Sequence, residues 1–146
     1  MSRNRVLSVL STAAALCLVR CGFLSVPEEV KAVAERYFES VKVQRFDATL
    51  DLYSPLFYEK TTREKWRTVL DKVAQKLGRL ESHELASWHV NHMAILPNPG
   101  TYTVLIYRVE YEKYPASETI TLYQPSLGGP CLIVGHNLNS EGLLLE

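Results

Sequence analysis

The sequence has few cysteines and no excess of charge of either sign. Its 16 basic and 16 acidic residues give the 146-residue chain a formal net charge of zero, and no run of like charge breaks this balance. Nothing in the composition therefore attracts nucleic acid by bulk electrostatics. Of the three cysteines, Cys17 and Cys21 lie in or at the end of an N-terminal apolar segment, so processing would leave no internal disulfide pair. We expect the remaining Cys131 to be a small buried hydrophobic residue and not a nucleophile.

Recognised motifs of nucleophilic, phosphate and metal chemistry are also missing. There is no nucleophile-elbow pattern, and Gly128 with Gly129 predicts a turn and not a phosphate cradle. His89 and His92 would share one face of a helix, but the surrounding residues favour a strand, on which this spacing sends them to opposite faces. No cysteine or carboxylate cluster completes a set of ligands. We therefore predict no metal site and no cofactor, and interpret both histidines as polar surface residues.

Length and composition indicate one globular domain. A chain of 146 residues that is 47% hydrophobic and 10% aromatic can bury a substantial core. We find no internal repeat, low-complexity segment or interdomain linker.

The first 21 residues have the layout of an export signal. Two arginines precede an apolar run at residues 6–19, and no acidic residue occurs before Glu28. The run is too short for a comfortable membrane span. A buried or amphipathic first helix is the alternative, but no polar face interrupts the run. We predict an export signal at residues 1–21 and a single domain at residues 22–146.

The end of this segment, Leu-Val-Arg-Cys at residues 18–21, resembles a bacterial lipoprotein lipobox. The residue before the cysteine is normally small in that pattern, and Arg20 departs from it. Cleavage among the alanines at residues 13–15 would leave an unusually short apolar core. We expect a lipid on Cys21, which would tether the domain to a membrane surface without spanning it. The predicted location is the bacterial cell envelope, as a periplasm-facing lipoprotein or a secreted protein.

Two segments have the apolar periodicity of long helices. Ser25 with Glu28 and Thr61 with Glu64 match capping boxes, and Gly78 can end the second of these helices in a left-handed conformation. The predicted buried stripes are Val30, Ala34, Tyr37, Phe38 and Val41 in the first helix, and Trp66, Val69, Leu70, Val73 and Leu77 in the second.

A short helix is predicted between them. Asp47 is placed to cap it, Leu50 and Tyr53 would face inward, and Pro55 would stop it.

The second half of the chain predicts four strands. Residues 84–96, 101–114, 117–124 and 131–139 are rich in β-branched and aromatic side chains and are separated by proline or glycine clusters, including Pro115 with Ala116. The connections are too short for parallel crossovers, so we expect an antiparallel meander. The fold class is therefore α+β, with three N-terminal helices packed on a curved four-stranded antiparallel sheet.

Alternation predicts which side chains of these strands share a face. In the second strand the core face would hold Leu105, Tyr107, Val109 and Tyr111. In the last strand His136 would share a face with Leu132, Val134 and Leu138. His136 is interpreted as a core or rim histidine.

The order of elements, with Glu64-Lys65-Trp66, Leu77-Gly78, the alternation of Tyr107, Val109 and Tyr111, and the closing GHNLN at residues 135–139, resembles the nuclear-transport-factor-type cone superfamily. That superfamily includes ketosteroid isomerases and polyketide cyclases. More narrowly, the chain is similar to small exported bacterial proteins of unknown function. The resemblance implies a cystatin-like cone, a curved sheet wrapped on a long helix with a hollow at its open end. It does not imply an activity.

Two functions are compatible with the predicted hollow. An isomerase-like site needs a carboxylate base that faces tyrosines in an apolar environment, and Asp47 or Glu118 could supply it. The simpler interpretation is that Asp47 caps a helix, that Glu118 starts a strand and that the tyrosines belong to the core. We assign no catalytic residue. The candidate pocket residues are Tyr37, Tyr53, Trp66, Trp88, Tyr107 and His136.

The preferred hypothesis is a noncatalytic envelope domain that binds a small apolar ligand or an envelope protein. Pairing through the open sheet face would make a homodimer, and the membrane would be contacted only through the N-terminal anchor. The alternative is an isomerase or cyclase-like enzyme with its carboxylate in the cone hollow.

Overall fold

The computed structural model describes residues 25–145. The predicted export signal and Cys21 lie outside them. The elements are α1 (Glu28–Lys42), α2 (Phe46–Leu50), α3 (Pro55–Tyr58), α4 (Arg63–Leu77), β1 (Leu80–Met93), β2 (Gly100–Tyr111), β3 (Pro115–Pro125), β4 (Leu132–Asn139) and the 3-10 helix η1 (Glu141–Leu143). The strands form one antiparallel sheet in the order β1-β2-β3-β4. The predicted α+β class and four-stranded meander are confirmed.

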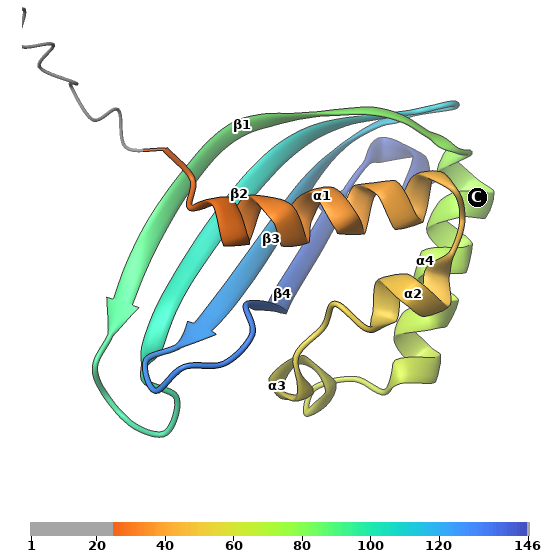
Figure 1. The fold of residues 1–146 in the computed structure, drawn as a ribbon. Helices are drawn as coiled ribbons and strands as arrows, with labels where there is room; N and C mark the ends of the chain where they lie inside the picture. Colours follow the sequence, from red (N-terminus) through yellow and green to blue (C-terminus); the bar gives the residue numbers. More distant parts are fainter. Residues whose placement is uncertain (1–24, 146) are drawn as a thin grey trace, which may run out of the picture.

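Figure 1 shows how the two halves of the chain meet. The sheet curves around α1, which lies across its inner face, while α2, α3 and α4 gather beyond β4 at one end of the molecule. At the opposite end the β1–β2 and β3–β4 loops lie together, and we call this end the open end. Within residues 25–145 no helix combines the length and apolar character needed to cross a membrane.

The long helices bury the stripes that their periodicity predicts, except that Trp66 is only partly buried and Val69 is exposed. All five predicted residues of α1 are buried, and so are Leu70, Val73 and Leu77 of α4. Val69 was predicted to be buried but is 41% exposed. It lies at the solvent edge of a stripe that is narrower than the sequence indicates.

The helix starts differ from the predicted caps. α1 follows Pro27 without a side-chain cap, so Ser25 lies too early for the proposed capping box. Thr62, one residue after the predicted Thr61, caps α4 by accepting a hydrogen bond from the Lys65 backbone N–H at 3.2 Å. Gly78 ends α4 as predicted, with φ of 85°.

The segment between the long helices holds two short helices, so within residues 25–145 four α-helices precede the sheet and not three. Asp47 lies inside the first turn of α2 and does not cap it. Pro55 does not stop α2, which already ends at Leu50. It begins α3, where its missing N–H and fixed φ are tolerated, and Ser54 accepts a hydrogen bond from the Leu56 N–H.

Several strand boundaries also differ from the prediction. β1 begins at Leu80, four residues earlier than expected. Pro115 and Ala116 were predicted to separate two strands, but they pair with Glu110 and Val109 at the start of β3. A proline is tolerated at the first position of a strand.

A β-bulge in β4 changes which of its side chains face the core. Thr121 pairs with Gly135 but Leu122 pairs with Ile133, so one residue of β4 is left over. His136, opposite the buried Ile120, and Ile133, opposite Leu122, therefore both face inward. The prediction that Leu132 and Val134 share the face of His136 was wrong, because the extra residue reverses the alternation.

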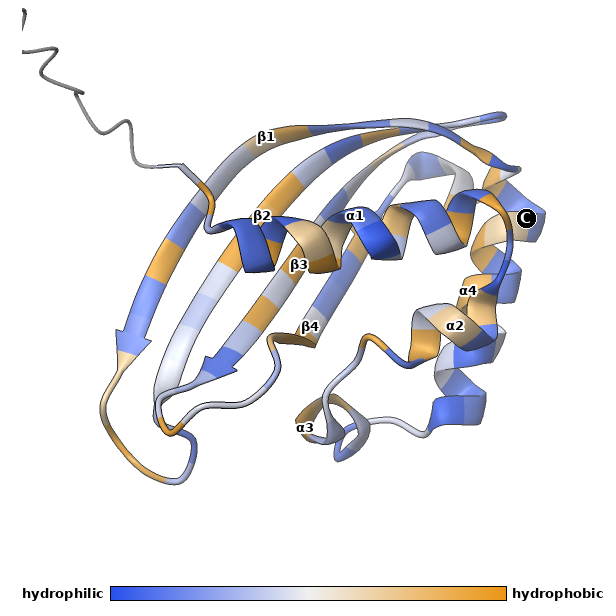
Figure 2. Ribbon diagram, viewed as in Figure 1, coloured by the Kyte–Doolittle hydropathy of each residue, from blue (hydrophilic) through white to orange (hydrophobic). Residues whose placement is uncertain are grey.

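Aromatic contacts join α1 to the sheet. Phe38 stacks on His83 of β1 with ring centroids 4.0 Å apart and meets Tyr107 of β2 edge-on at 4.7 Å. Figure 2 shows apolar segments on the strands where they pass beneath α1. This packing fixes the position of Tyr37, the neighbour of Phe38, relative to β3.

Candidate functional site

A carboxylate lies at the centre of the core. Glu118, on the inward face of β3 with Ile120 and Leu122, has no exposed surface. The Tyr37 hydroxyl donates to its Oε2 at 2.9 Å and the Tyr111 hydroxyl donates to its Oε1 at 2.5 Å. His136 Nε2 lies 3.1 Å from Oε2. A buried carboxylate with three surrounding hydrogen-bond partners avoids most of the cost of an unpaired buried charge.

His136 extends this network to the helical layer. Its Nδ1 lies 2.7 Å from the Tyr53 hydroxyl, and its side chain is almost fully buried. When Nε2 carries the proton and donates to Glu118, Nδ1 accepts from Tyr53, so every polar atom of the imidazole has a partner. We call Tyr37, Tyr53, Tyr111, Glu118 and His136 the Glu118 cluster.

The three tyrosines of the cluster remain hydrogen-bond donors over a wide pH range. Burial is the largest cause that raises the pKa of Tyr37, Tyr53 and Tyr111, and the negative charge of Glu118 adds to it. The indole N–H of Trp66 partly opposes the rise in the pKa of Tyr53. That N–H is buried beside the cluster and, among the described residues, no acceptor meets it with hydrogen-bond geometry.

The cavity beside the Glu118 cluster is too small for a substrate. The cavity that touches Tyr37 and Tyr111 has a volume of only about 10 Å³, enough for about one water molecule. It lies between α1, α4 and the ends of β1 and β2. The Glu118 cluster therefore has the composition of an acid–base site and the enclosure of a structural core.

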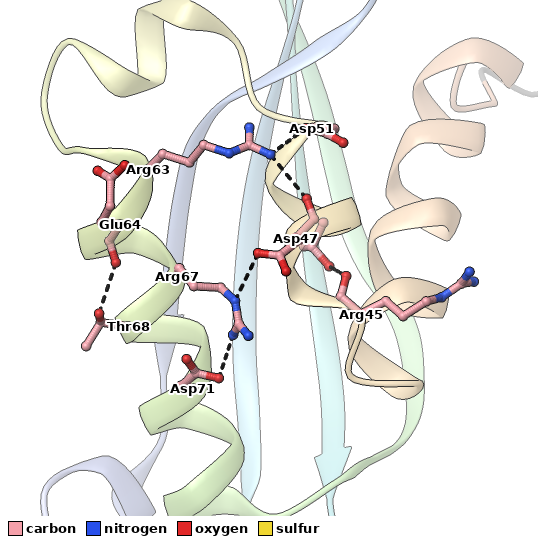
Figure 3. A network of polar contacts seen from close by, with 9 residues as sticks. Arg45, Asp47, Asp51, Arg63, Glu64, Arg67, Thr68 and Asp71 are labelled. Atoms are coloured by element: carbon pink, nitrogen blue, oxygen red, sulfur yellow. Dashed lines mark hydrogen bonds and ion pairs between the residues drawn. The ribbon is translucent and has the colours of Figure 1, made fainter.

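Asp47, the other candidate base, lies on the surface. Figure 3 shows it on α2 opposite Arg67 of α4. Arg67 Nε is 3.3 Å from Asp47 Oδ1, and Arg67 Nη1 is 2.6 Å from Asp71 Oδ1. Arg63 makes a similar link to Asp51 at 2.5 Å. Asp47 thus joins α2 to α4 through an exposed ion pair, an arrangement that supports a structural role.

A groove lies at the other end of the domain. It is lined by Ser25 and Pro27 before α1, by Trp88, His89, Val90 and His92 of β1, and by Thr101 of β2. Its volume is about 550 Å³, and most of its lining is apolar. We call it the open-end groove.

The six predicted pocket residues therefore lie in three places. Tyr37, Tyr53 and His136 belong to the Glu118 cluster, and Trp66 packs against it with its ring centroid 5.5 Å from that of His136. The other two lie apart from it, Trp88 in the open-end groove and Tyr107 in a smaller hollow of about 120 Å³ beside Glu35 and His83.

The sequence interpretation missed that Glu118 is the centre of the cluster. The simpler interpretation placed this residue at the start of a strand. The signal was present, because Glu118 alternates in phase with Ile120 and Leu122, both of which are buried.

Neither region of the described chain has the donors of a metal site. No group of three or more histidine, cysteine or carboxylate side chains in residues 25–145 is arranged to hold a metal ion. His92 Nδ1 lies 3.1 Å from the Thr101 hydroxyl, and Cys131 is buried, which raises the pKa of its thiol to about 11.

The fold and site define an α+β domain whose helices cover one face of an open antiparallel sheet over a buried carboxylate. The chain belongs to a family described as "Protein of unknown function (DUF4019)", whose model matches residues 33–128, about two-thirds of the sequence. The matched region includes Tyr37, Tyr53, Tyr111 and Glu118 and ends before His136. No curated protein matches the sequence.

Proposed function

We propose that the protein is a noncatalytic domain of the bacterial cell envelope that binds an apolar ligand in the open-end groove. The groove carries this proposal. Its volume of about 550 Å³ falls in the range of small-molecule sites, about 300–1,000 Å³. Trp88 and Val90 offer apolar contact, while His92 and Thr101 place a few polar atoms among them.

The enclosure of the Glu118 cluster also supports a noncatalytic role. Its hydrogen-bonding groups are used within the protein, and the adjoining cavity holds no more than about one water molecule. The finer fold belongs to the same proposal: the curved sheet around α1 is that of a nuclear-transport-factor-type cone, with the groove as its hollow.

Anchoring completes the proposed role. The apolar run at residues 6–19 would direct export, and a lipid on Cys21 would hold the domain at a membrane. Both features precede the described residues. Comparison of wild type with Cys21→Ala by metabolic palmitate labelling tests the anchor, and equal labelling of the two would contradict it.

Ligand binding is tested by tryptophan fluorescence. The chain has two tryptophans, so the Trp66→Phe variant leaves Trp88 as the only emitter. Titration with a brominated fatty acid should quench Trp88 and leave the emission of the matched Trp88→Phe variant, in which only Trp66 emits, unchanged. Equal quenching in both variants, or none in either, would contradict binding in the groove.

A second candidate function rests on one observation, the contact of Glu118 with two tyrosine hydroxyls and a histidine. This is the donor and carboxylate set that an isomerase or cyclase requires. This second function needs a conformation in which the Glu118 cluster opens to a substrate. Hydrogen–deuterium exchange that shows α1 separating from β3 faster than global unfolding would favour this function.

A further inference from the structure

Half of the sheet carries no charged side chain. No Asp, Glu, Lys or Arg occurs in residues 85–107 or 119–140, although 22% of the chain is charged. Leu85 pairs with Tyr107 and Ile106 pairs with Thr119, so the two stretches form one continuous zone that ends in the β1–β2 and β3–β4 loops. We call this zone the uncharged half.

The two loops at the end of the uncharged half expose large apolar side chains. Ile95 and Leu96 of the β1–β2 loop are 77% and 80% exposed, and Leu127 of the β3–β4 loop is 96% exposed. Figure 2 shows the apolar segment in the β1–β2 loop, at the lower left of the view. Side chains that protrude this far are not packed in the core.

Tyrosines hold the bases of these loops in place. The Tyr102 hydroxyl donates to the Asn98 carbonyl and the Tyr123 hydroxyl donates to the Pro99 carbonyl, both at 3.1 Å. The two rings pack together with centroids 4.7 Å apart, and the Ser126 N–H also donates to the Pro99 carbonyl. The loops are therefore held together as one tip with a pair of aromatic rings just behind it.

The proposed anchor leads to the same half of the molecule. Ser25 and Pro27 line the open-end groove with His92 and Thr101. Cys21 lies four residues before Ser25, and an extended chain spans at most about 3.5 Å per residue. A lipid on Cys21 would therefore keep the start of the domain within about 14 Å of the bilayer surface.

We propose that the β1–β2 and β3–β4 loops insert Ile95, Leu96 and Leu127 into the interfacial region of the anchoring membrane. The open-end groove then faces the bilayer surface. This inference rests on the proposed envelope location. The partner that the two loops contact is the lipid bilayer. Isolated protruding apolar side chains backed by tyrosines are features of a membrane-contacting surface, because tyrosine rings are favoured at the bilayer interface.

The charge distribution favours lipid contact through apolar side chains. The uncharged half has no lysine or arginine with which to bind anionic headgroups, and Glu28 and Glu29 begin α1 nearby. Insertion should therefore occur equally in neutral and anionic vesicles and should change little with salt.

The test uses the full chain reconstituted in phosphatidylcholine vesicles that contain nitroxide-labelled lipid. An environment-sensitive fluorescent amino acid is incorporated at position 127 or, as a matched control, at position 144. Leu144 is 81% exposed and follows η1, which packs against α4. We expect a blue shift and quenching by the nitroxide at position 127 and neither change at position 144.

Three other results would overturn the proposal. They are equal signals at positions 127 and 144, a shift at position 127 that occurs without vesicles through self-association, and a shift that appears only with an added protein partner. Glu substitutions of Ile95 and Leu96 should abolish the shift at position 127, while Leu144→Glu should preserve it.

The membrane contact and the anchor can fail separately. Mass spectrometry of the same preparation reports whether Cys21 carries a lipid. An unmodified Cys21 with quenching at position 127 would remove the anchor and keep the loop contact. A lipid-modified Cys21 without quenching at position 127 would keep the anchor and remove the loop contact.

Discussion

The Glu118 cluster and the tip of the uncharged half belong to the same sheet but place polar and apolar groups in opposite ways. The cluster buries a carboxylate and surrounds it with hydrogen-bond donors. The uncharged half excludes formal charge altogether and exposes apolar side chains at its tip. One region has polar groups where water is absent, and the other has apolar groups where water is present.

This contrast separates the residues that stabilise the fold from those that are available for binding. A buried carboxylate with several partners fixes the packing of the elements that supply them, here α1, β2, β3 and β4. Exposed apolar side chains contribute little to the fold and are available to a ligand or a membrane. Substitutions in the cluster should therefore change stability, and substitutions at the tip should change binding.

The largest loss of stability is expected from Glu118→Ala. It leaves the Tyr37 and Tyr111 hydroxyls and His136 Nε2 without their acceptor in the core, which should lower the free energy of unfolding by about 3–5 kcal/mol. Urea denaturation followed by circular dichroism measures the loss. Asp47→Ala, which removes an exposed ion pair, should cost less than about 1 kcal/mol. Similar losses in the two variants would refute the structural role of the cluster.

A loss of stability at alkaline pH should follow from the same region. The folded pKa values of Tyr37, Tyr53 and Tyr111 are raised above the ordinary 10.0, so the unfolded chain releases these protons first. Their stabilising contribution is complete below pH 10 and is lost as the pH rises above it, at up to about 1.4 kcal/mol per pH unit for each group. Urea denaturation between pH 9 and 11 measures the slope.

Tyr53→Phe is the control for this pH dependence. It removes one titrating group, so the slope above pH 10 should become shallower by up to about 1.4 kcal/mol per pH unit. An unchanged slope would mean that Tyr53 ionises as readily in the folded protein as in the unfolded chain.

A smaller loss of stability is expected when the same substitution is made at the end of α4 and in the β3–β4 loop of the uncharged half. Gly78 and Gly128 have φ values of 85° and 87°, so alanine is strained at both. A Cβ on Gly78 would lie 2.7 Å from the Glu112 Cβ, whereas a Cβ on Gly128 meets nothing within 4 Å. We expect Gly128→Ala to cost about 1 kcal/mol and Gly78→Ala roughly 1–3 kcal/mol more, because only Gly78 is packed against a neighbour. Thermal unfolding should show the difference, and equal costs would mean that Glu112 moves aside freely.

The local patterns of the sequence predicted most of the fold. The stripe of α1 and the four strands follow from periodicities that operate within one element, and the structure confirms them. Helix starts were less predictable, because Thr61 and Thr62 are adjacent and only Thr62 has the geometry to accept from the Lys65 N–H. The sequence predicted a turn at Pro115, but this residue begins β3. Its place in the strand depends on pairing with Glu110, which no local sequence pattern indicates.

The candidate site was less predictable because its contacts are distant in sequence. Tyr37 and Glu118 are 81 residues apart, and His136 reaches Glu118 only because the bulge in β4 leaves Ile133 and His136 on one face. Sequence alternation placed Glu118 in phase with buried residues but could not show which donors would meet it. Trp88 and Tyr107 were grouped with the others as pocket candidates, but Trp88 lines the open-end groove and Tyr107 lines a separate hollow beside Glu35 and His83.

The smallest effect on stability and the sharpest contrast with Glu118 are expected from Leu127→Glu. The side chain is 96% exposed and covers no core, so the free energy of unfolding should change by less than about 0.5 kcal/mol. The same substitution places a charge at the tip of the uncharged half, and we expect it to reduce the quenching of Trp88 by nitroxide-labelled lipid in vesicles that carry the full Trp66→Phe chain. Paired urea and quenching measurements test both parts. A large loss of stability would show that the loop is packed in solution, and unchanged quenching would show that the tip does not determine how the groove approaches the membrane.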